Sequence, residues 1–76
     1  MISYTVMRTI DSQKGTVLAK RLSDGLCAII KARYLAPFAP DTPDLNIHKA
    51  ASRMSALRLN YTTVWLPPEN YKEIIL

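Results

Sequence analysis

The chain has a single cysteine, Cys27, among its 76 residues, so it cannot form an internal disulfide. A chain this short buries only about two-thirds of its unfolded surface, and small secreted domains usually compensate with disulfides. Structural zinc needs four cysteine, histidine or carboxylate ligands at characteristic spacings, and the sequence has no C-x-x-C or H-x-x-x-H arrangement. The fold must therefore rest on one hydrophobic core, which predicts a single domain over residues 1–76 with no metal and no cofactor.

Nothing in the sequence predicts export or membrane insertion. The first ten residues, MISYTVMRTI, lack the basic segment and following apolar stretch of a signal peptide. The longest apolar run is 26–30, far short of the roughly 20 residues that span a bilayer. Together with the lone thiol, this predicts a cytoplasmic protein without a membrane partner.

The N-terminal residues alternate between apolar and polar side chains. Ile2, Tyr4 and Val6 fall on one face at a period of two, and threonine and serine fall on the other. This pattern predicts a strand at 2–10. The glycine-containing segment 11–15 is typical of a turn.

Residues 16–35 fit two different periodicities. Leucine and isoleucine side chains three and four residues apart favour a helix. Strict alternation over 26–34, with Asp24-Gly25 as a hairpin turn, favours strands instead. Periodicity does not decide between the two, and we favour a second strand at 16–21 followed by a helix at 24–35.

The second half of the chain begins with a proline-rich connector. Thr42 and Pro43 together are a good helix start, because a hydroxyl can cap the first turn and proline presets the backbone angle. The expected helix runs over 43–59 and ends at Asn60, and 61–66 follows as a late strand. The predicted fold class is α+β, with a small antiparallel sheet from strands near 2–10, 16–21 and 61–66 packed against helices near 24–35 and 43–59.

The sequence does not predict an enzyme. Nucleophilic catalysis needs a nucleophile beside a base, and the chain has one cysteine, Cys27, and one histidine, His48. Cys27 lies between apolar neighbours, where free cysteine is usually a small buried hydrophobe. Gly15 and Gly25 are too far apart to form a loop that cradles phosphate. We therefore expect no catalytic residues.

The charge distribution predicts an anionic partner. Residues 1–40 hold six basic and two acidic side chains, a net charge of +4, whereas residues 41–76 hold four of each. A basic surface favours nucleic acid or an acidic protein. Segment 15–33 fits a helix-turn-helix pattern only in part, because Ser23 stands where glycine is expected. The candidate basic patch comprises Lys20, Arg21, Lys31 and Arg33.

A second candidate surface lies at the C-terminus, where apolar side chains need either the core or a partner to cover them. Aromatic side chains are frequent in binding hot spots. The candidate anchor comprises Tyr71, Ile74, Ile75 and Leu76. We expect a small binding protein that acts stoichiometrically on a protein partner, as phage or mobile-element inhibitors and adaptors of host machines do. The alternative is a DNA- or RNA-binding regulator, and either form is compatible with a homodimer.

Overall fold

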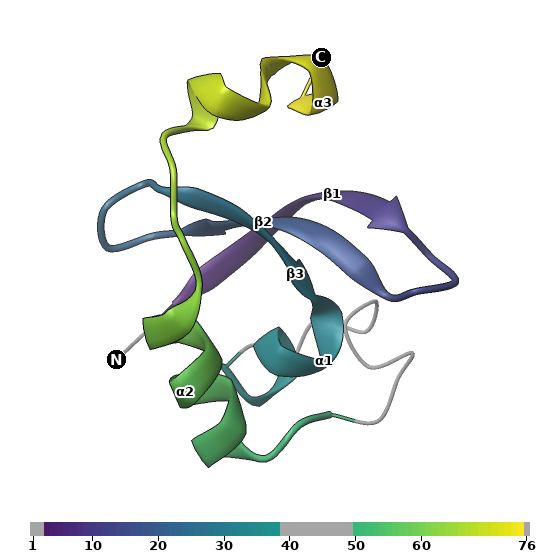
Figure 1. The fold of residues 1–76 in the computed structure, drawn as a ribbon, viewed down its shortest axis with the longest axis vertical. Helices are drawn as coiled ribbons and strands as arrows, with labels where there is room; N and C mark the ends of the chain where they lie inside the picture. Colours follow the sequence, from purple (N-terminus) through teal and green to yellow (C-terminus); the bar gives the residue numbers. More distant parts are fainter. Residues whose placement is uncertain (1–2, 39–49, 76) are drawn as a thin grey trace.

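The computed structural model describes residues 3–38 and 50–75, which form a three-stranded antiparallel sheet with helical segments on both sides (Figure 1). The strands are β1 (Tyr4–Asp11), β2 (Thr16–Arg21) and β3 (Cys27–Lys31), and each pairs with the next along the chain. The predicted α+β class is confirmed. β2 has the predicted bounds, and β1 lies within two residues of the predicted strand.

Two short turns connect the strands. In the first, the Asp11 carboxylate accepts hydrogen bonds from the backbone N–H groups of Gln13 (2.9 Å) and Lys14 (3.1 Å). In the second, Gly25 takes a positive φ of 74° and donates its N–H to the Arg21 carbonyl (2.7 Å). A side chain is strained in that left-handed conformation, which explains glycine at this position. The Asp24-Gly25 hairpin turn is therefore present.

The predicted helix at 24–35 is wrong, because residues 27–31 form β3. Its apolar positions alternate in the ladder, where Ala28 pairs with Ala19 and Ile30 pairs with Val17. All four side chains are buried. Pairing with the side of β2 that β1 leaves open thus overrides the helical spacing of the same residues. Helical backbone begins only after β3, with α1 (Ala32–Leu35) and the 3-10 turn η1 (Ala36–Phe38).

The second predicted helix corresponds in part to α2 (Arg53–Thr62). The predicted start at Thr42-Pro43, with the rest of 39–49, lies outside the described residues, and residues 50–52 are not helical. The Ser52 hydroxyl caps α2 by accepting the N–H of Ser55 (3.2 Å). A capping serine fixes the first helical residue, so the described helix begins later than predicted.

The predicted strand at 61–66 is also wrong. Tyr61 and Thr62 are the last residues of α2, which continues through the predicted stop at Asn60. Within 61–66, only Leu66 pairs with the sheet, through a single antiparallel bridge to Cys27. The β-branched and aromatic residues of this segment therefore do not form a strand. Tyr61 and Thr62 end the helix, and residues 63–65 lead from it to the bridge at Leu66.

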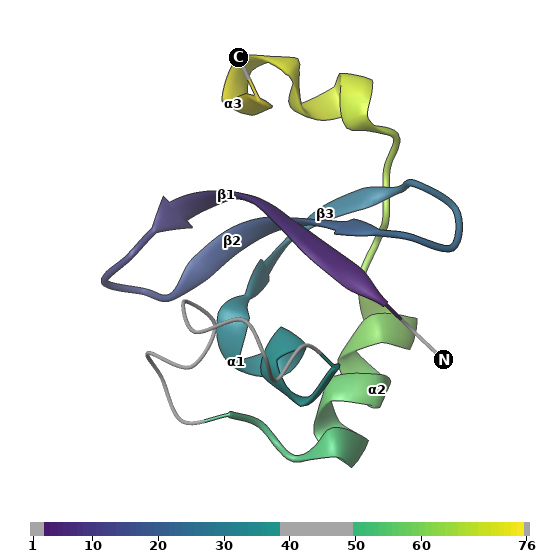
Figure 2. The ribbon, with the colours of Figure 1, turned by 180° about the vertical axis from the view of Figure 1, so that it is seen from behind.

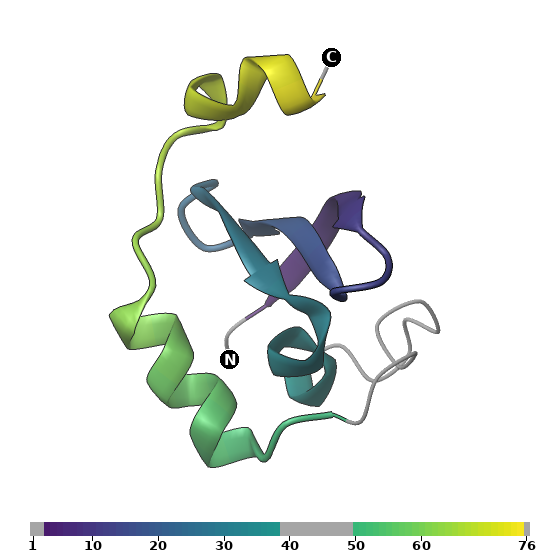
Figure 3. The same cartoon turned by 45° about the vertical axis from the view of Figure 1, so that its right-hand side comes forward.

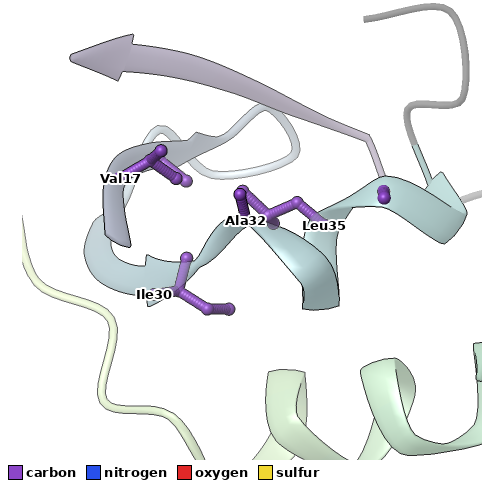
Figure 4. Close-up of a cluster of buried hydrophobic side chains, with 6 residues drawn as sticks. Val17, Ile30, Ala32 and Leu35 are labelled. Atoms are coloured by element: carbon purple, nitrogen blue, oxygen red, sulfur yellow. The ribbon is translucent and has the colours of Figure 1, made fainter. Parts of the chain in front are cut away.

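The core lies between the sheet and the two helices α1 and α2. Val17 and Ile30 reach from β2 and β3 toward Ala32 and Leu35 of α1, as Figure 4 shows. Tyr4, Val6, Tyr34 and Leu59 pack against this cluster from its margins. The strand alternation predicted for the start of the chain is therefore what directs Tyr4 and Val6 inward.

The C-terminal segments lie on the opposite side of the sheet from α1 and α2 (Figures 2 and 3). They are the 3-10 turn η3 (Pro68–Tyr71) and the helical turn α3 (Lys72–Ile75). The Arg8 guanidinium donates a hydrogen bond to the Ile74 carbonyl, which connects α3 with β1. Leu18 of β2 and Cys27 of β3 are fully buried within the fold. Over residues 3–38 and 50–75, no helix is long and apolar enough to cross a membrane.

Candidate binding surface at the open edge of the sheet

The outer edge of β3 presents backbone groups that β2 does not use. Hydrogen-bonded and non-hydrogen-bonded pairs alternate along an antiparallel ladder. Cys27 directs its N–H and C=O outward, to Leu66 (2.7 and 2.8 Å), whereas Ala32 directs its N–H inward, to Gly15 (2.7 Å). The backbone N–H and C=O groups of the odd-numbered residues of β3 therefore point away from β2. By this alternation, Ile29 and Lys31 also direct their N–H groups to the outer edge.

Among the described residues, the outer edge is paired at Cys27 alone. Neither the N–H nor the C=O of Ile29 makes a hydrogen bond to any residue in 3–38 or 50–75. The other edge of the sheet is different, because β1 has irregular register after Val6 and after Thr9. Bulges of this kind discourage pairing with another strand. The regular edge of β3 is therefore the better template for an additional strand.

A hollow of about 270 Å³ lies beside this edge. The C-terminal end of α2 creates its far wall, because Thr63 donates both its N–H (2.8 Å) and its hydroxyl (2.6 Å) to the Leu59 carbonyl. This capping turns the chain out of the helix before it reaches the bridge at Leu66. We call the hollow and the adjoining strand edge the β3-edge site, which is lined by Ile29, Ile30, Lys31, Tyr34, Leu59 and Thr63.

The β3-edge site is both apolar and positively charged. Ile29 is 43% exposed although it lies in the middle of a strand. Lys31 lines the hollow, and the Arg33 guanidinium carbon lies 5.3 Å from the centre of the Tyr34 ring, close enough for a cation–π contact. No aspartate or glutamate is among the lining residues described here. The site therefore suits a ligand that has apolar groups and negative charge.

The predicted basic patch is divided in the structure. Lys20 pairs with Cys27 near one end of the sheet, and Lys31 pairs with Thr16 at the other. Four residues of strand separate the two positions, or roughly 13 Å. Lys31 therefore lines the β3-edge site, and Arg33 lies beside it at Tyr34, whereas Lys20 is not part of the site.

Arg21, the fourth member of the predicted patch, is engaged within the molecule. Its Nε atom donates to both carboxylate oxygens of Asp24 at 3.1 Å, and its guanidinium carbon lies 4.8 Å from the centre of the Trp65 ring. The hydrogen bond with Arg21 lowers the pKa of Asp24, and the same bond raises the pKa of Arg21. Arg21 therefore orders the second turn rather than offering a free charge.

The predicted C-terminal anchor forms part of the molecule's own packing where it is described. Tyr71 and Ile74 are half-buried. Ile74 lines a hollow of about 280 Å³ with Ile10, Arg8, Thr9 and Glu73, so it faces β1. The side chain of Ile75 and all of Leu76 lie outside the described residues. The described part of the anchor thus lies on the opposite side of the sheet from α2.

A buried polar cluster holds the exit from α2 against the sheet. The Tyr4 hydroxyl donates to the Asn60 side-chain oxygen (2.5 Å), and the Trp65 ring N–H donates to the Asn60 carbonyl (3.2 Å). The rings of Tyr4 and Trp65 stack with their centres 5.5 Å apart. These contacts fix the path of residues 60–65 and therefore the far wall of the β3-edge site.

Among the described residues, Cys27 is a buried thiol rather than an activated nucleophile. Cys27 is fully buried, its Sγ atom lies 3.6 Å from the Met7 sulfur, and burial raises the pKa of its thiol. A raised pKa disfavours the reactive thiolate. His48, the base considered with it, lies outside the described residues. No group of three or more histidine, cysteine, aspartate or glutamate side chains in 3–38 and 50–75 can hold a metal ion.

Through its charge, the sequence pointed to one lining residue of the β3-edge site, Lys31, and to Arg33, which contacts the lining residue Tyr34. Ile29 was missed, because the favoured helix at 24–35 would have buried it. The strand alternative contained the needed signal, since it places Ile29 on the face opposite Ala28 and Ile30. Comparison with protein-family models, curated proteins and solved structures found no match to this chain.

Proposed function

We propose that this chain is a non-catalytic binding protein that acts stoichiometrically on a protein partner, and that the β3-edge site is its contact surface. The observation that carries the proposal is the combination, within residues 3–38 and 50–75, of a strand edge paired only at Cys27, an exposed Ile29 and a basic, apolar hollow in one place. An open, apolar strand edge is a template for pairing with another polypeptide. The small size of the chain is compatible with an inhibitor or adaptor that occupies one surface of a larger machine, as phage and mobile-element accessory proteins do.

The position of the charges favours protein over nucleic acid. Binding to a phosphate backbone usually recruits several lysine and arginine side chains on one face. Here Lys20 and Lys31 are near opposite ends of the sheet, and Arg21 is paired with Asp24. The net charge of +4 keeps a nucleic-acid-binding regulator as the alternative function.

Two matched variants test the proposal. Ile29→Glu places a negative charge in the β3-edge site, and Met54→Glu places the same charge on α2 at a side chain that is 82% exposed. Immobilised protein is incubated with nuclease-treated lysate of the source organism, and the captured proteins are compared by mass spectrometry. We expect a stoichiometric partner that is retained by wild type and Met54→Glu and lost by Ile29→Glu.

Fluorescence anisotropy with a random 20-base-pair duplex distinguishes the alternative. We expect no binding at micromolar protein in physiological salt. Tight duplex binding that weakens steeply with added salt would contradict the proposed function. A partner that Ile29→Glu captures as well as wild type does would place the contact surface elsewhere.

A further inference from the structure

The β3-edge site has the geometry to receive one particular kind of ligand. Resting on the proposed function, we propose that this ligand is an extended segment of the partner, with alternating apolar and acidic residues, which pairs with β3 as a fourth strand. Strand addition of this type obtains affinity from main-chain hydrogen bonds and specificity from alternate side chains. The chain's own Leu66 already occupies the first position of such a strand, opposite Cys27.

The backbone of β3 supplies the first part of the recognition. Continuing the antiparallel register from Leu66 and Cys27 would place Val64 opposite Ile29, yet these residues do not pair. The chain leaves the ladder there because Thr63 is held to Leu59 at the end of α2. The outward N–H and C=O of Ile29 thus stay open to a strand that takes up the ladder where residues 63–65 leave it.

The hollow supplies the second part. Successive side chains of an added strand point to opposite faces of the sheet, so every second one would be directed toward Tyr34 and Leu59 on the α2 side. A dry apolar cavity of about 150 Å³ is large enough for benzene, and this hollow measures about 270 Å³. It therefore accommodates one large apolar side chain or two small ones.

Charge supplies the third part. Lys31 lines the hollow, and the Arg33 guanidinium lies against the ring of the lining residue Tyr34. No described acidic side chain lines this largely apolar hollow. Acidic residues on either side of the apolar anchor would complement this charge, and basic ones would be repelled.

A second copy of the chain fits this edge less well. Two β3 edges that paired antiparallel about Ile29 would bring Lys31 of one copy opposite Cys27 of the other. Leu66 already occupies that position. The same arrangement would bring the basic flanks of the two copies together. The geometry therefore favours a different polypeptide over self-association.

The probe is an eight-residue peptide that alternates valine and glutamate, added to 15N-labelled full-length protein. Two matched peptides serve as controls: one with lysine in place of glutamate, and one with N-methyl groups on alternate backbone amides. We expect saturable binding of the acidic peptide, with exchange of the Ile29 and Lys31 amides slowed at least tenfold. We expect no binding of either control peptide at the same concentrations.

A protein variant tests the same hydrogen bond from the other side. Ile29→Pro removes an N–H that β2 does not use, and proline is tolerated on edge strands at such positions. We expect it to weaken peptide binding about tenfold, whereas Ile29→Val, which keeps the N–H, retains binding. Circular dichroism shows whether each variant is folded, and the N-methylated peptide gives the same information with wild-type protein.

Several outcomes would overturn strand addition. They are failure of the acidic peptide to bind, equal binding of the lysine or N-methylated peptide, and binding without protection of the Ile29 amide. A dimer seen by analytical ultracentrifugation and abolished in Ile29→Glu would show that the edge binds a second copy instead. If a captured partner is lost in Ile29→Glu while the acidic peptide fails to bind wild type, the proposed function holds and strand addition is wrong.

Discussion

Removing the Tyr4 hydroxyl tests whether the buried polar cluster holds α2 against the sheet. Tyr4→Phe keeps the ring that stacks on Trp65 but deletes the donor to the Asn60 side-chain oxygen. Asn60 is only 7% exposed, so its oxygen would lose a partner in a place that water reaches poorly. The substitution therefore isolates one hydrogen bond without removing the packing around it.

The expected loss is large relative to the stability of so small a domain. An unsatisfied buried acceptor costs about 1–3 kcal/mol, and the half-buried position of Tyr4 places this case at about 1–2 kcal/mol. A domain of this length has a total free energy of unfolding of roughly 4–11 kcal/mol. Tm should accordingly fall by about 4–16 °C.

Tyr61→Phe is the matched control, because it deletes a hydroxyl from a tyrosine side chain that follows Asn60 on α2 and is 79% exposed. Its effect should stay within about 0.5 kcal/mol. Thermal and urea unfolding, both followed by circular dichroism, measure the two variants. Equal stability of Tyr4→Phe, Tyr61→Phe and wild type would refute the role assigned to the Asn60 cluster.

The same hydroxyl has a pH signature. Burial raises the pKa of Tyr4 above its ordinary value of 10.0, so the folded state binds this proton more tightly than the unfolded state. The resulting contribution to stability is complete below pH 10 and is lost as pH rises through the raised folded value. The Tm difference between wild type and Tyr4→Phe should therefore shrink in alkaline solution.

Three further predictions concern the second turn and the thiol. Because Arg21 lowers the pKa of Asp24, their pairing stabilises the fold above the ordinary aspartate value of 3.8 and loses this effect as pH falls through the lowered value; Asp24→Asn should remove that part of the acid dependence of Tm. Gly25→Ala should cost about 1–2 kcal/mol, measured by urea unfolding, because φ is 74° and the added methyl group meets only ordinary contact. Cys27 should react with a thiol reagent far more slowly in the native protein than in urea, since it is fully buried. If the native protein were labelled as fast as the unfolded protein, the burial of the Cys27 thiol would be contradicted.

Local pattern was sufficient where neighbouring residues pair. β1, β2 and the turn between them follow from alternation, a turn-forming aspartate and a glycine, all within a few residues of one another. The α+β class followed as well. Pairing of adjacent segments through a short turn depends on local chemistry, which a sequence displays directly.

Local pattern failed where distant segments compete for the same residues. Segment 27–31 satisfies both a helical and a strand period, and the free outer side of β2 decided for the strand. Asn60 looked like a helix stop, yet it lies inside α2, where its side chain accepts a hydrogen bond from Tyr4, 56 positions earlier. Of the predicted strand at 61–66, Tyr61 and Thr62 end α2, and Leu66 alone bridges to the sheet, at Cys27.

The sequence by itself determined the α+β class, the first hairpin, the buried character of Cys27 and the basic side chains at Lys31 and Arg33. The tertiary structure decided which edge of the sheet stays open and where the basic side chains gather. An open edge is a property of pairing across the whole sheet, and the hollow exists because Thr63 ends α2 short of the bridge at Leu66. Contacts between residues far apart in the chain set both features, so no local periodicity encodes them.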